Sequence, residues 1–429
     1  MISVEEAQEA ILLRIGRLGR ERVHLGDAMG RVLAEDVTAP NPIPPWANSA
    51  MDGYAVRAAD VAAATREDPA TLRVVDEVAA GFESSKTVGP GEAIRIMTGA
   101  PVPRGADAIV MVELTERGRE GEVRVLGPAP KGESIRLQGE DVRAGEKVFE
   151  SGAWLTPAAV AMLAGVGKGF VYVYRRPRVG ILATGDELVE LDREPGVGQI
   201  FNSNSYALAA QVREAGGEPH LLGIARDNAE DLESHLRGAL GMDAVLTSGG
   251  VSVGDFDLVK GTLGDLGSEM HFWRVRMKPG KPMAFGTLQG CPVFGLPGNP
   301  VSTMVSFELF VRPSLLKMQG RAELHRPKVE ARLLHPLHKS PERRHYVRAA
   351  AAHEDEGWTV KAVEAQGSNI IHSMVRANAL IVFPEFETAL EAGSRVQVLL
   401  LDGESALGAR PLPSGGPGAL VSAGARTNC

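Results

Sequence analysis

The sequence predicts a multidomain protein that combines α/β and β architecture around a doubly wound α/β domain. The chain has 429 residues, which is more than one hydrophobic core usually supports. From Pro177, apolar runs such as PRVGILATG alternate with helix-compatible segments such as NSNSYALAAQVREAGG, a pattern typical of a parallel sheet covered by helices. On both sides of this region, short β-rich runs broken by turn residues predict smaller β domains.

The first part of the chain predicts a split domain. Ser3 and Glu6 form a capping-box pattern before apolar positions at helical spacing, which predicts a first helix. Four prolines between 40 and 45 exclude regular structure there, and β-rich runs follow over 72–148. The helical pattern WLTPAAVAMLAGVG then returns, so we interpret the β region as an insertion into a discontinuous, elongated domain.

The last part predicts a compact β barrel, because short strand patterns follow one another after Arg326. The remainder from Glu404 is rich in Gly, Ser, Pro and Ala and predicts a disordered tail. The predicted boundaries are 1–44 with 141–175 for the elongated domain, 45–140 for the inserted β domain, 176–325 for the doubly wound domain, 326–403 for the barrel and 404–429 for the tail.

Composition excludes several classes of function. A net charge of -8 provides no general basic field, which argues against nucleic acid and against an anionic membrane as the main partner. The two cysteines, Cys291 and Cys429, have no metal-ligand spacing, so neither a zinc site nor a disulfide framework is expected. No apolar run is long enough to span a membrane, and the first residues are acidic where a signal peptide is basic. We expect a cytoplasmic protein.

The stretch DAVLTSGGVSVGDFDLVK at 243–260 reads as a strand that leads into a glycine-rich loop. Gly249 and Gly250 remove side chains where an anion can approach backbone N–H groups. Asp255 stands where a phosphate-binding P-loop needs its lysine, so a hydrated Mg²⁺ that bridges to a phosphate fits better than a bare triphosphate. A tight strand-to-helix turn with two solvated acids is an equally good interpretation of this stretch alone.

Polar loops follow four of the predicted parallel strands. They are TGDEL, RDN, TSGGVSVGDFD and GLPGNPVS, the last with Asn299 as a candidate helix cap before Pro300. Ligands bind at the carboxyl ends of such strands. We therefore expect these loops to converge in space.

Candidates in the inserted part are ambiguous on their own. Asp52 in NSAMDGYAV is either a base or metal ligand on a stiff loop or a plain Asp-Gly turn. Thr98 in TGAPVPRGAD taken alone lies in a β connection. Asp141, close to Arg136 and Glu140, belongs either to a site or to a solvated surface salt bridge.

The turn KPGKPMAFG, which we call the dilysine turn, offers two cations. Lys278 and Lys281 repel each other, so a stiff turn that holds both favours a bound dianion over an exposed basic turn. Arg348 in RRHYVRA and Ser368 in QGSNI lie in the predicted barrel, and the sequence pattern alone assigns both a structural role.

Taken together, NSAMDGYAV, IMTGAPVPRGADAIVMVE, TGDEL, TSGGVSVGDFD, KPGKPMAFG and GLPGNPVS resemble the molybdopterin molybdenumtransferase family, the MoeA-like proteins, over nearly all of residues 1–402. The resemblance implies a homodimer of four-domain chains. It also implies that molybdate is inserted into adenylylated molybdopterin, with Mg²⁺-dependent release of AMP.

The resemblance also assigns roles to residues, by matching positions. It implies catalytic roles for Asp52, Thr98, Asp141, Glu187, Asp227 and Asp257, of which Asp227 and Asp257 are the candidate Mg²⁺ ligands. It implies substrate contacts for Gly249, Gly250, Ser252, Lys278, Lys281, Asn299, Ser302, Arg348 and Ser368.

Two rival functions share part of this pattern. An adenylyltransferase or nucleotide pyrophosphatase would use the same α/β domain without requiring the inserted domain, the dilysine turn or the barrel. A non-catalytic scaffold would usually need a fused domain or a long linker. Further partners expected for an insertase are the supplier of molybdopterin adenylate and molybdoenzyme acceptors.

Overall fold

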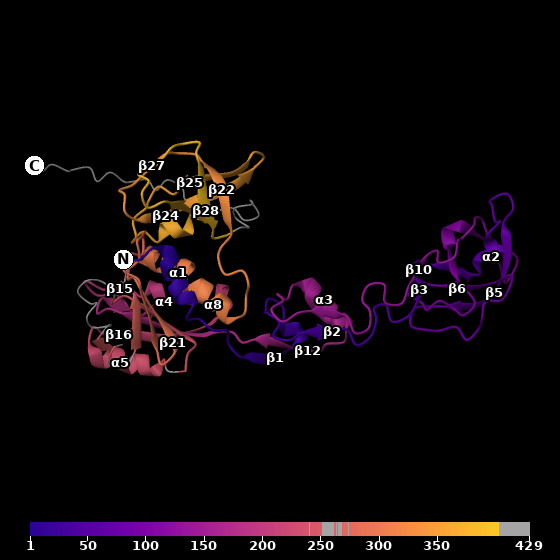
Figure 1. Ribbon diagram of the computed structural model, residues 1–429, viewed down its shortest axis with the longest axis horizontal. Helices are drawn as coiled ribbons and strands as arrows, with labels where there is room; N and C mark the ends of the chain where they lie inside the picture. The colour runs from indigo at the N-terminus through magenta and orange to yellow at the C-terminus, as the bar shows by residue number, and fades with distance from the viewer. Residues whose placement is uncertain (240, 251–260, 263, 265–267, 273, 403–429) are drawn as a thin grey trace, which may run out of the picture. The chain divides into compact units, whose positions relative to one another are not determined.

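The computed structural model describes residues 1–239, 241–250, 261–262, 264, 268–272 and 274–402. These form two compact units, which are described separately (Figure 1). One unit contains Met1–Arg20 together with the chain from Tyr174 onward, and the other contains Glu21–Val173. The predicted tail lies outside the described residues. No helix in the described ranges is long and apolar enough to cross a membrane.

The first unit contains a six-stranded sheet. Four neighbouring strands pair in parallel, and each of the next two pairs antiparallel with the strand before it. In spatial order the strands are β16 (Glu218–Ala225), β13 (Arg178–Thr184), β17 (Ala244–Ser248), β21 (Cys291–Leu296), β20 (Ala284–Leu288) and β18 (Ser268–Phe272). The helices are α4 (Ser203–Glu214), α5 (Ala229–Gly238), α7 (Pro300–Ser306), the π-helical turn η3 (Phe307–Val311) and α8 (Arg312–Met318). A short ribbon joins β14 (Leu188–Val189) to β15 (Ile200–Phe201).

Alternate residues of the central strands pack on opposite faces of this sheet. Ile181 and Leu246 belong to the core shared with α4, α7 and α8, whereas Leu182 and Val245 pack against α5. The period of two along buried parallel strands therefore places helices on both faces. This confirms the predicted doubly wound domain.

Helix α1 (Val4–Leu12) belongs to the same unit as this sheet. Ser3 and Glu6 form the predicted capping box, and the buried face includes Val4, Ala7 and Ile11. This apolar face joins the core formed by η3 and α8, and Figure 1 shows α1 beside α8. The helix thus differs from the predicted assignment of 1–44 to the elongated domain, because the partner of an apolar helical face is chosen by tertiary packing.

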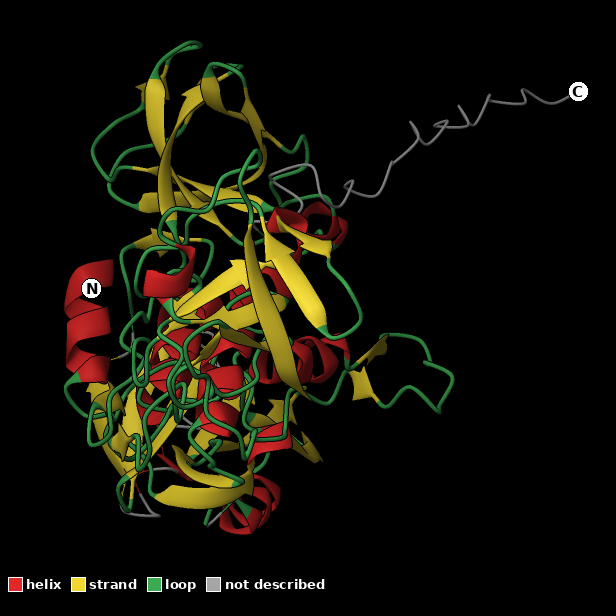
Figure 2. Ribbon diagram, turned by 90° about the vertical axis from the view of Figure 1, so that its right-hand side faces the viewer, coloured by secondary structure: helices red, strands yellow, loops and turns green. Residues whose placement is uncertain are grey.

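The C-terminal part of this unit is a closed β barrel, as predicted, whose curled strands are visible in Figure 2. The barrel closes because its last strand in spatial order also pairs with its first. Its strands are β24 (Arg344–Glu354), β25 (Gly357–Ala362), β22 (Lys328–Leu333), β28 (Arg395–Leu400) and β26 (Ala379–Phe383), accompanied by α9 (His372–Val375) and the pair β23 (Leu337–His338) and β27 (Ala389–Leu390). The short strand β19 (Met277–Lys278) of the α/β domain extends the barrel sheet by pairing with β24.

The second unit contains a curled, half-barrel sheet and a small helical part. The sheet runs β7 (Ala108–Met111), β4 (Gly53–Val56), β6 (Glu92–Ile96), β5 (Ala70–Val78), β9 (Glu122–Val125) and β8 (Thr115–Arg117), with α2 (Ala58–Val61) and η2 (Val112–Leu114). The other elements are β1 (Arg20–His24), η1 (Leu25–Asp27), β2 (Val37–Thr38), β3 (Asn48–Ser49), β10 (Ile135–Arg136), β11 (Lys147–Phe149), α3 (Pro157–Gly165) and β12 (Phe170–Tyr174). Pairing of β1 with β12 and of β2 with β11 joins chain segments that precede and follow the half-barrel.

Candidate functional site

The loops after the four parallel strands lie around one cavity of about 510 Å³. Because β16, β13, β17 and β21 are parallel, their carboxyl ends meet at one edge of the sheet, as the strand-end rule predicts. The cavity is lined by residues from each loop, including Glu187, Asp227, Gly249, Gly250 and Asn299. It therefore combines two carboxylates, a glycine turn and an amide.

Gly249 allows the loop after β17 to pass directly beside the end of β13. Its φ is +97°, and a Cβ at this position would lie 2.5 Å from the backbone oxygen of Thr184. Its N–H donates to the carbonyl of Leu296 over 3.2 Å. A side chain would therefore separate loops that now share a cavity wall.

Asn204 in the first turn of α4 fixes two of these loops. Its Nδ2 donates to Ser248 Oγ over 2.9 Å and to the Gly298 carbonyl over 2.7 Å. Asn204 also lines the cavity, yet the sequence pattern did not single it out. The available signal was its place in NSNS, a polar run that opens the helix after a strand-end loop.

A second cavity of about 790 Å³ adjoins the first. We call the first the strand-end cavity and the second the basic cavity. The two share Pro282, Pro297, Asn299 and Asn369 as lining residues. Among the described residues that line the second cavity there is no Asp or Glu, although the whole chain carries a net charge of -8. The basic side chains that line it are Lys278, Lys281, Lys339, Arg343 and Arg348, with His338 and His345. Such a lining favours an anion.

Arg348 brings a buried cation from the barrel to this cavity. The residue is 2% exposed, and its guanidinium donates to Ser373 Oγ over 3.2 Å and to the Gly367 carbonyl over 3.1 Å. In the described part of the chain no carboxylate lies within ion-pair distance of it. Burial lowers its pKa, because the charged form loses solvation. A bound oxyanion would supply the missing negative charge.

Strand pairing brings the barrel residues and the dilysine turn together. Lys278 on β19 lies opposite His345 on β24 in parallel register. Arg348 and Ser368 therefore line the same cavity as Lys278 and Lys281.

His345 lies among the cations of this cavity. Burial, followed by the charges of Lys278, Lys339 and Arg343, lowers the pKa of His345 to about 4. Its ring also lies 6.5 Å from that of Phe383, measured between centroids. The imidazole is therefore neutral at neutral pH.

Asn299 and Ser302 lie at the start of α7. Pro300 occupies the first turn as predicted, but the Asn299 side chain makes no capping hydrogen bond. Instead the Val301 N–H donates to the Ser368 carbonyl over 3.1 Å. The Asn299 amide lines both cavities and the buried Ser302 lines the second, so both predicted contacts lie at the candidate site.

Asp52, Thr98 and Asp141 belong to the second unit. Asp52 Oδ1 accepts hydrogen bonds from the Thr98 N–H and from Thr98 Oγ1, each over 2.7 Å. These bonds, the backbone one first, lower the pKa of Asp52. Asp141 is exposed and forms no ion pair with the nearby Arg136 in the described part of this unit. The structure thus links two of these three residues.

The first cavity has a donor set suited to a hard divalent cation. Glu187 and Asp227 supply carboxylates, and Ser248, Asn202 and Asn204 line the same space. Within the described ranges no three His, Cys, Asp or Glu side chains gather as a metal cluster. Mg²⁺ commonly binds through one or two protein carboxylates together with substrate phosphates, so the residues present fit it. The predicted residues Ser252 and Asp257 lie outside the described residues, as does Asp255.

Comparison with family models covers most of the chain in three segments. Residues 2–167 match the MoeA N-terminal region (domain I and II), residues 180–317 match a probable molybdopterin binding domain, and residues 330–401 match the MoeA C-terminal region (domain IV).

Individual relatives match over nearly their full length. The chain is 40% identical over 411 residues to a molybdopterin molybdenumtransferase of Nostoc sp., covering 94% of each chain. It is 38% identical to the molybdopterin molybdenumtransferase of Bacillus subtilis, covering 90% of each. The crystal structure of a molybdopterin biosynthesis MoeA protein from Pyrococcus horikoshii OT3 superposes with a TM-score of 0.80 at 34% identity, covering 93% of this chain and all of that one. The fold, the adjoining cavities and these matches together show that the chain belongs to the molybdopterin molybdenumtransferase (MoeA) family.

Proposed function

We propose that this protein is a transferase of molybdenum cofactor biosynthesis that inserts molybdate into adenylylated molybdopterin. The observation that carries the proposal is a cavity with five Lys or Arg residues and no acid among its described lining residues, next to the strand-end cavity. A tetrahedral dianion and an anionic pterin nucleotide would thus bind side by side. The names of the relatives at 40% and 38% identity support the same activity.

The oxyanion would bind in the basic cavity. Lys278, Lys281 and Arg348 supply positive charge, while Ser302 and Ser368 line the same space. Charge-assisted hydrogen bonds from fixed cations are strong and cost little reorganisation during reaction. These residues would hold molybdate next to the pterin dithiolene.

The pterin adenylate would bind at the strand ends. Gly249 and Gly250 carry no side chain that would keep a phosphate away from the loop backbone, and Asn299 lies where the two cavities meet. Glu187 and Asp227, with Asp257 as expected from the resemblance, would hold Mg²⁺. When bound, this ion offsets the negative charge of the phosphoanhydride whose hydrolysis releases AMP. Ser252 is proposed as a further phosphate contact.

Further features of the proposal come from the family resemblance. We infer catalytic roles for Asp52, Thr98 and Asp141, a homodimeric state and a cytoplasmic location. Molybdopterin-adenylate suppliers and molybdoenzyme acceptors are the proposed partners. The four-domain organisation also remains part of this proposal, with α1 in the unit that contains the α/β domain.

The rival functions account for fewer of the observations. An adenylyltransferase or pyrophosphatase that uses only the α/β domain has no need for Arg348 and Ser368, which the barrel brings to the basic cavity. A scaffold has no need for a buried arginine to which the described residues offer no acidic partner.

Reconstitution tests the proposed activity. Purified protein is mixed with adenylylated molybdopterin and Mg²⁺, with and without molybdate, and AMP and metal-loaded cofactor are measured. We expect formation of AMP and of metal-loaded cofactor to require both molybdate and Mg²⁺. EDTA should therefore suppress both products. AMP release that is indifferent to molybdate would favour a pyrophosphatase, and absence of metal-loaded cofactor would exclude insertion.

A further inference from the structure

The first residues of the chain contact the segment that leads into β19 and contact the strand β24, and these carry Lys278 and Arg348. We call residues Ile2–Glu6 the N-terminal clamp. The Ile2 N–H donates to the Arg274 carbonyl over 3.2 Å, and the Arg276 N–H donates to the Ile2 carbonyl over 2.8 Å. Ile2 and Val275 thus form a parallel bridge just before Lys278. The clamp therefore fixes the backbone that leads into the dilysine turn.

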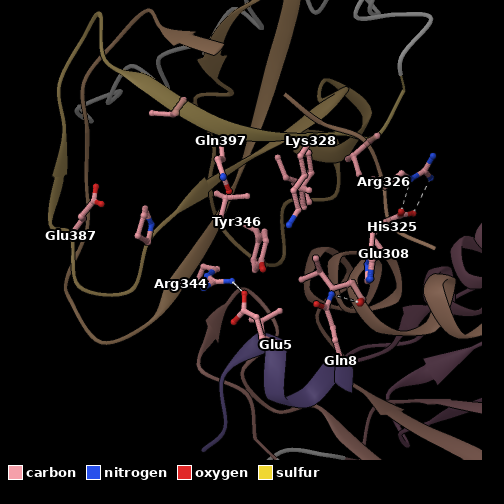
Figure 3. Close-up of a pocket in the computed structure, with 18 of the residues that line it drawn as sticks. Glu5, Gln8, Glu308, His325, Arg326, Lys328, Arg344, Tyr346, Glu387 and Gln397 are labelled. Carbon is pink, nitrogen blue, oxygen red and sulfur yellow. Dashed lines mark hydrogen bonds and ion pairs between the residues drawn. The ribbon is translucent and has the colours of Figure 1, made fainter. Parts of the chain in front are cut away.

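The same clamp reaches the strand that carries Arg348. The Arg344 guanidinium, near the start of β24, forms an ion pair with the Glu5 carboxylate (Figure 3). Arg344 Nη2 also lies 3.0 Å from Glu385 Oε1, and the Arg344 N–H donates to the Arg276 carbonyl over 3.1 Å. Burial favours the neutral form of the Glu5 carboxyl and by itself would raise its pKa. The hydrogen bond from Arg344 and the positive charge of Arg344 together outweigh burial, so the pKa of Glu5 is lowered. Arg348 lies four residues later on the same strand.

The clamp is anchored to the core of the α/β domain by the rest of α1. The Gln8 amide donates to the Leu309 carbonyl over 2.9 Å, and Lys317 Nζ donates to the Leu12 carbonyl over 2.7 Å. Ile11 is fully buried on the apolar face of the helix. Glu5 is thus held on a rigid support.

The Glu5 side chain borders a cavity and is not enclosed by the protein core. A cavity of about 380 Å³ separates α1 from the barrel strands, and Figure 3 shows Glu5, Arg344 and Tyr346 along its wall. The Glu5 side chain is 62% exposed. Removing its charge therefore leaves the hydrophobic core intact, and the effect of a substitution reports on the ion pair.

We propose that Ile2 and Glu5 are positioning residues that set the separation of Lys278 and Arg348 across the basic cavity, an inference that rests on the proposed molybdate site. The cations on β19, on the dilysine turn and on β24 repel one another while no anion lies between them. The clamp opposes this repulsion because Ile2 bonds to the segment that leads into β19, while Glu5 on α1 pairs with Arg344 on β24. It touches neither the oxyanion nor the strand-end cavity, so it acts on the affinity for the oxyanion alone.

The test compares Glu5→Gln with the matched control Glu9→Gln in the full-length protein. Glu9 is an exposed glutamate on the same helix with no ion pair among the described residues. Molybdate binding is measured by equilibrium dialysis with molybdenum quantified in each chamber. We expect Glu5→Gln to weaken binding by about two- to fivefold, the range that a partly exposed ion pair supplies, and Glu9→Gln to leave it unchanged.

Kinetics and a double variant separate positioning from a general loss of structure. Glu5→Gln should raise the KM for molybdate while kcat at saturating molybdate and the KM for pterin adenylate stay at wild-type values. Combining Glu5→Gln with Arg344→Gln should weaken binding no further than Arg344→Gln alone, because both act through one contact.

Three outcomes would overturn the inference. Molybdate binding by Glu5→Gln equal to that of Glu9→Gln removes the role of the clamp while the proposed function stands. Equal loss of affinity for molybdate and pterin adenylate shows that the clamp has only a general structural role. Failure of the wild-type protein to bind molybdate would overturn both the clamp and the proposed function.

Discussion

Arg348 shows how the role of a single residue depends on contacts that local sequence does not encode. The alternation in RRHYVRA is enough to predict a strand, but not the cavity that the strand borders. Arg348 reaches the site because β24 pairs with β19 from another domain. The family resemblance therefore predicted its place, and that of Ser368, where pattern alone assigned both a structural role.

His345 offers a direct probe of this cavity. Its pKa is lowered from 6.5 to about 4 by burial and by Lys278, Lys339 and Arg343. Between these pH values the unfolded chain binds more protons than the folded one. The contribution of His345 to the free energy of unfolding is therefore fully present above pH 6.5 and is lost as pH falls towards 4. We expect His345→Gln to reduce the fall in melting temperature between pH 6.5 and 4. The control His353→Gln, on an exposed part of β24, should leave that fall unchanged.

Bound molybdate should also shift this titration. A dianion beside Lys278 offsets the cationic field, so the pKa of His345 followed by NMR should rise when molybdate is added. An unchanged titration in the presence of saturating molybdate would contradict binding in this cavity.

At the scale of the element, parallel strand ends were the most predictable part of the site. The alternation of strands and helices was enough to expect the loops after β13, β16, β17 and β21 at one edge. The contacts among these loops were less predictable. Asn204 ties two of them together through its side chain, which bonds to loops distant in sequence, and the Asn299 side chain makes no capping hydrogen bond.

Gly249→Ala tests the tight approach of two such loops. The added Cβ would meet the Thr184 carbonyl and require a positive φ, so we expect a loss of about 1–3 kcal/mol in unfolding free energy and weaker pterin-adenylate binding. Gly241→Ala is the control, since Gly241 also has a positive φ but open space around its Cβ position. Denaturant unfolding and pterin-adenylate titration provide the readouts. Equal effects of the two substitutions would show that the backbone conformation, and not the loop contact, matters.

At the scale of the whole molecule, composition and periodicity predicted the classes of domain, while tertiary packing decided which segments belong together. The first helix was predicted correctly as a helix, but its apolar face packs with η3 and α8. That placement brings Ile2 and Glu5 next to the strands of the basic cavity, which no local pattern indicates. The glycine loop has Asp255 where a P-loop has its lysine, and the cations of the neighbouring cavity include Lys278 and Lys281 of the dilysine turn and Arg348 of the barrel.

The most direct test of the account is to compare molybdate and pterin-adenylate binding to the wild type and to the double variant Lys278→Ala, Lys281→Ala. The basic cavity and the strand-end cavity have separate linings apart from four shared residues, and neither lysine is shared. We expect molybdate affinity to fall by at least about tenfold, because two charge-assisted contacts are lost, while pterin-adenylate affinity stays near that of the wild type. Equal loss of both affinities, or loss of neither, would contradict it.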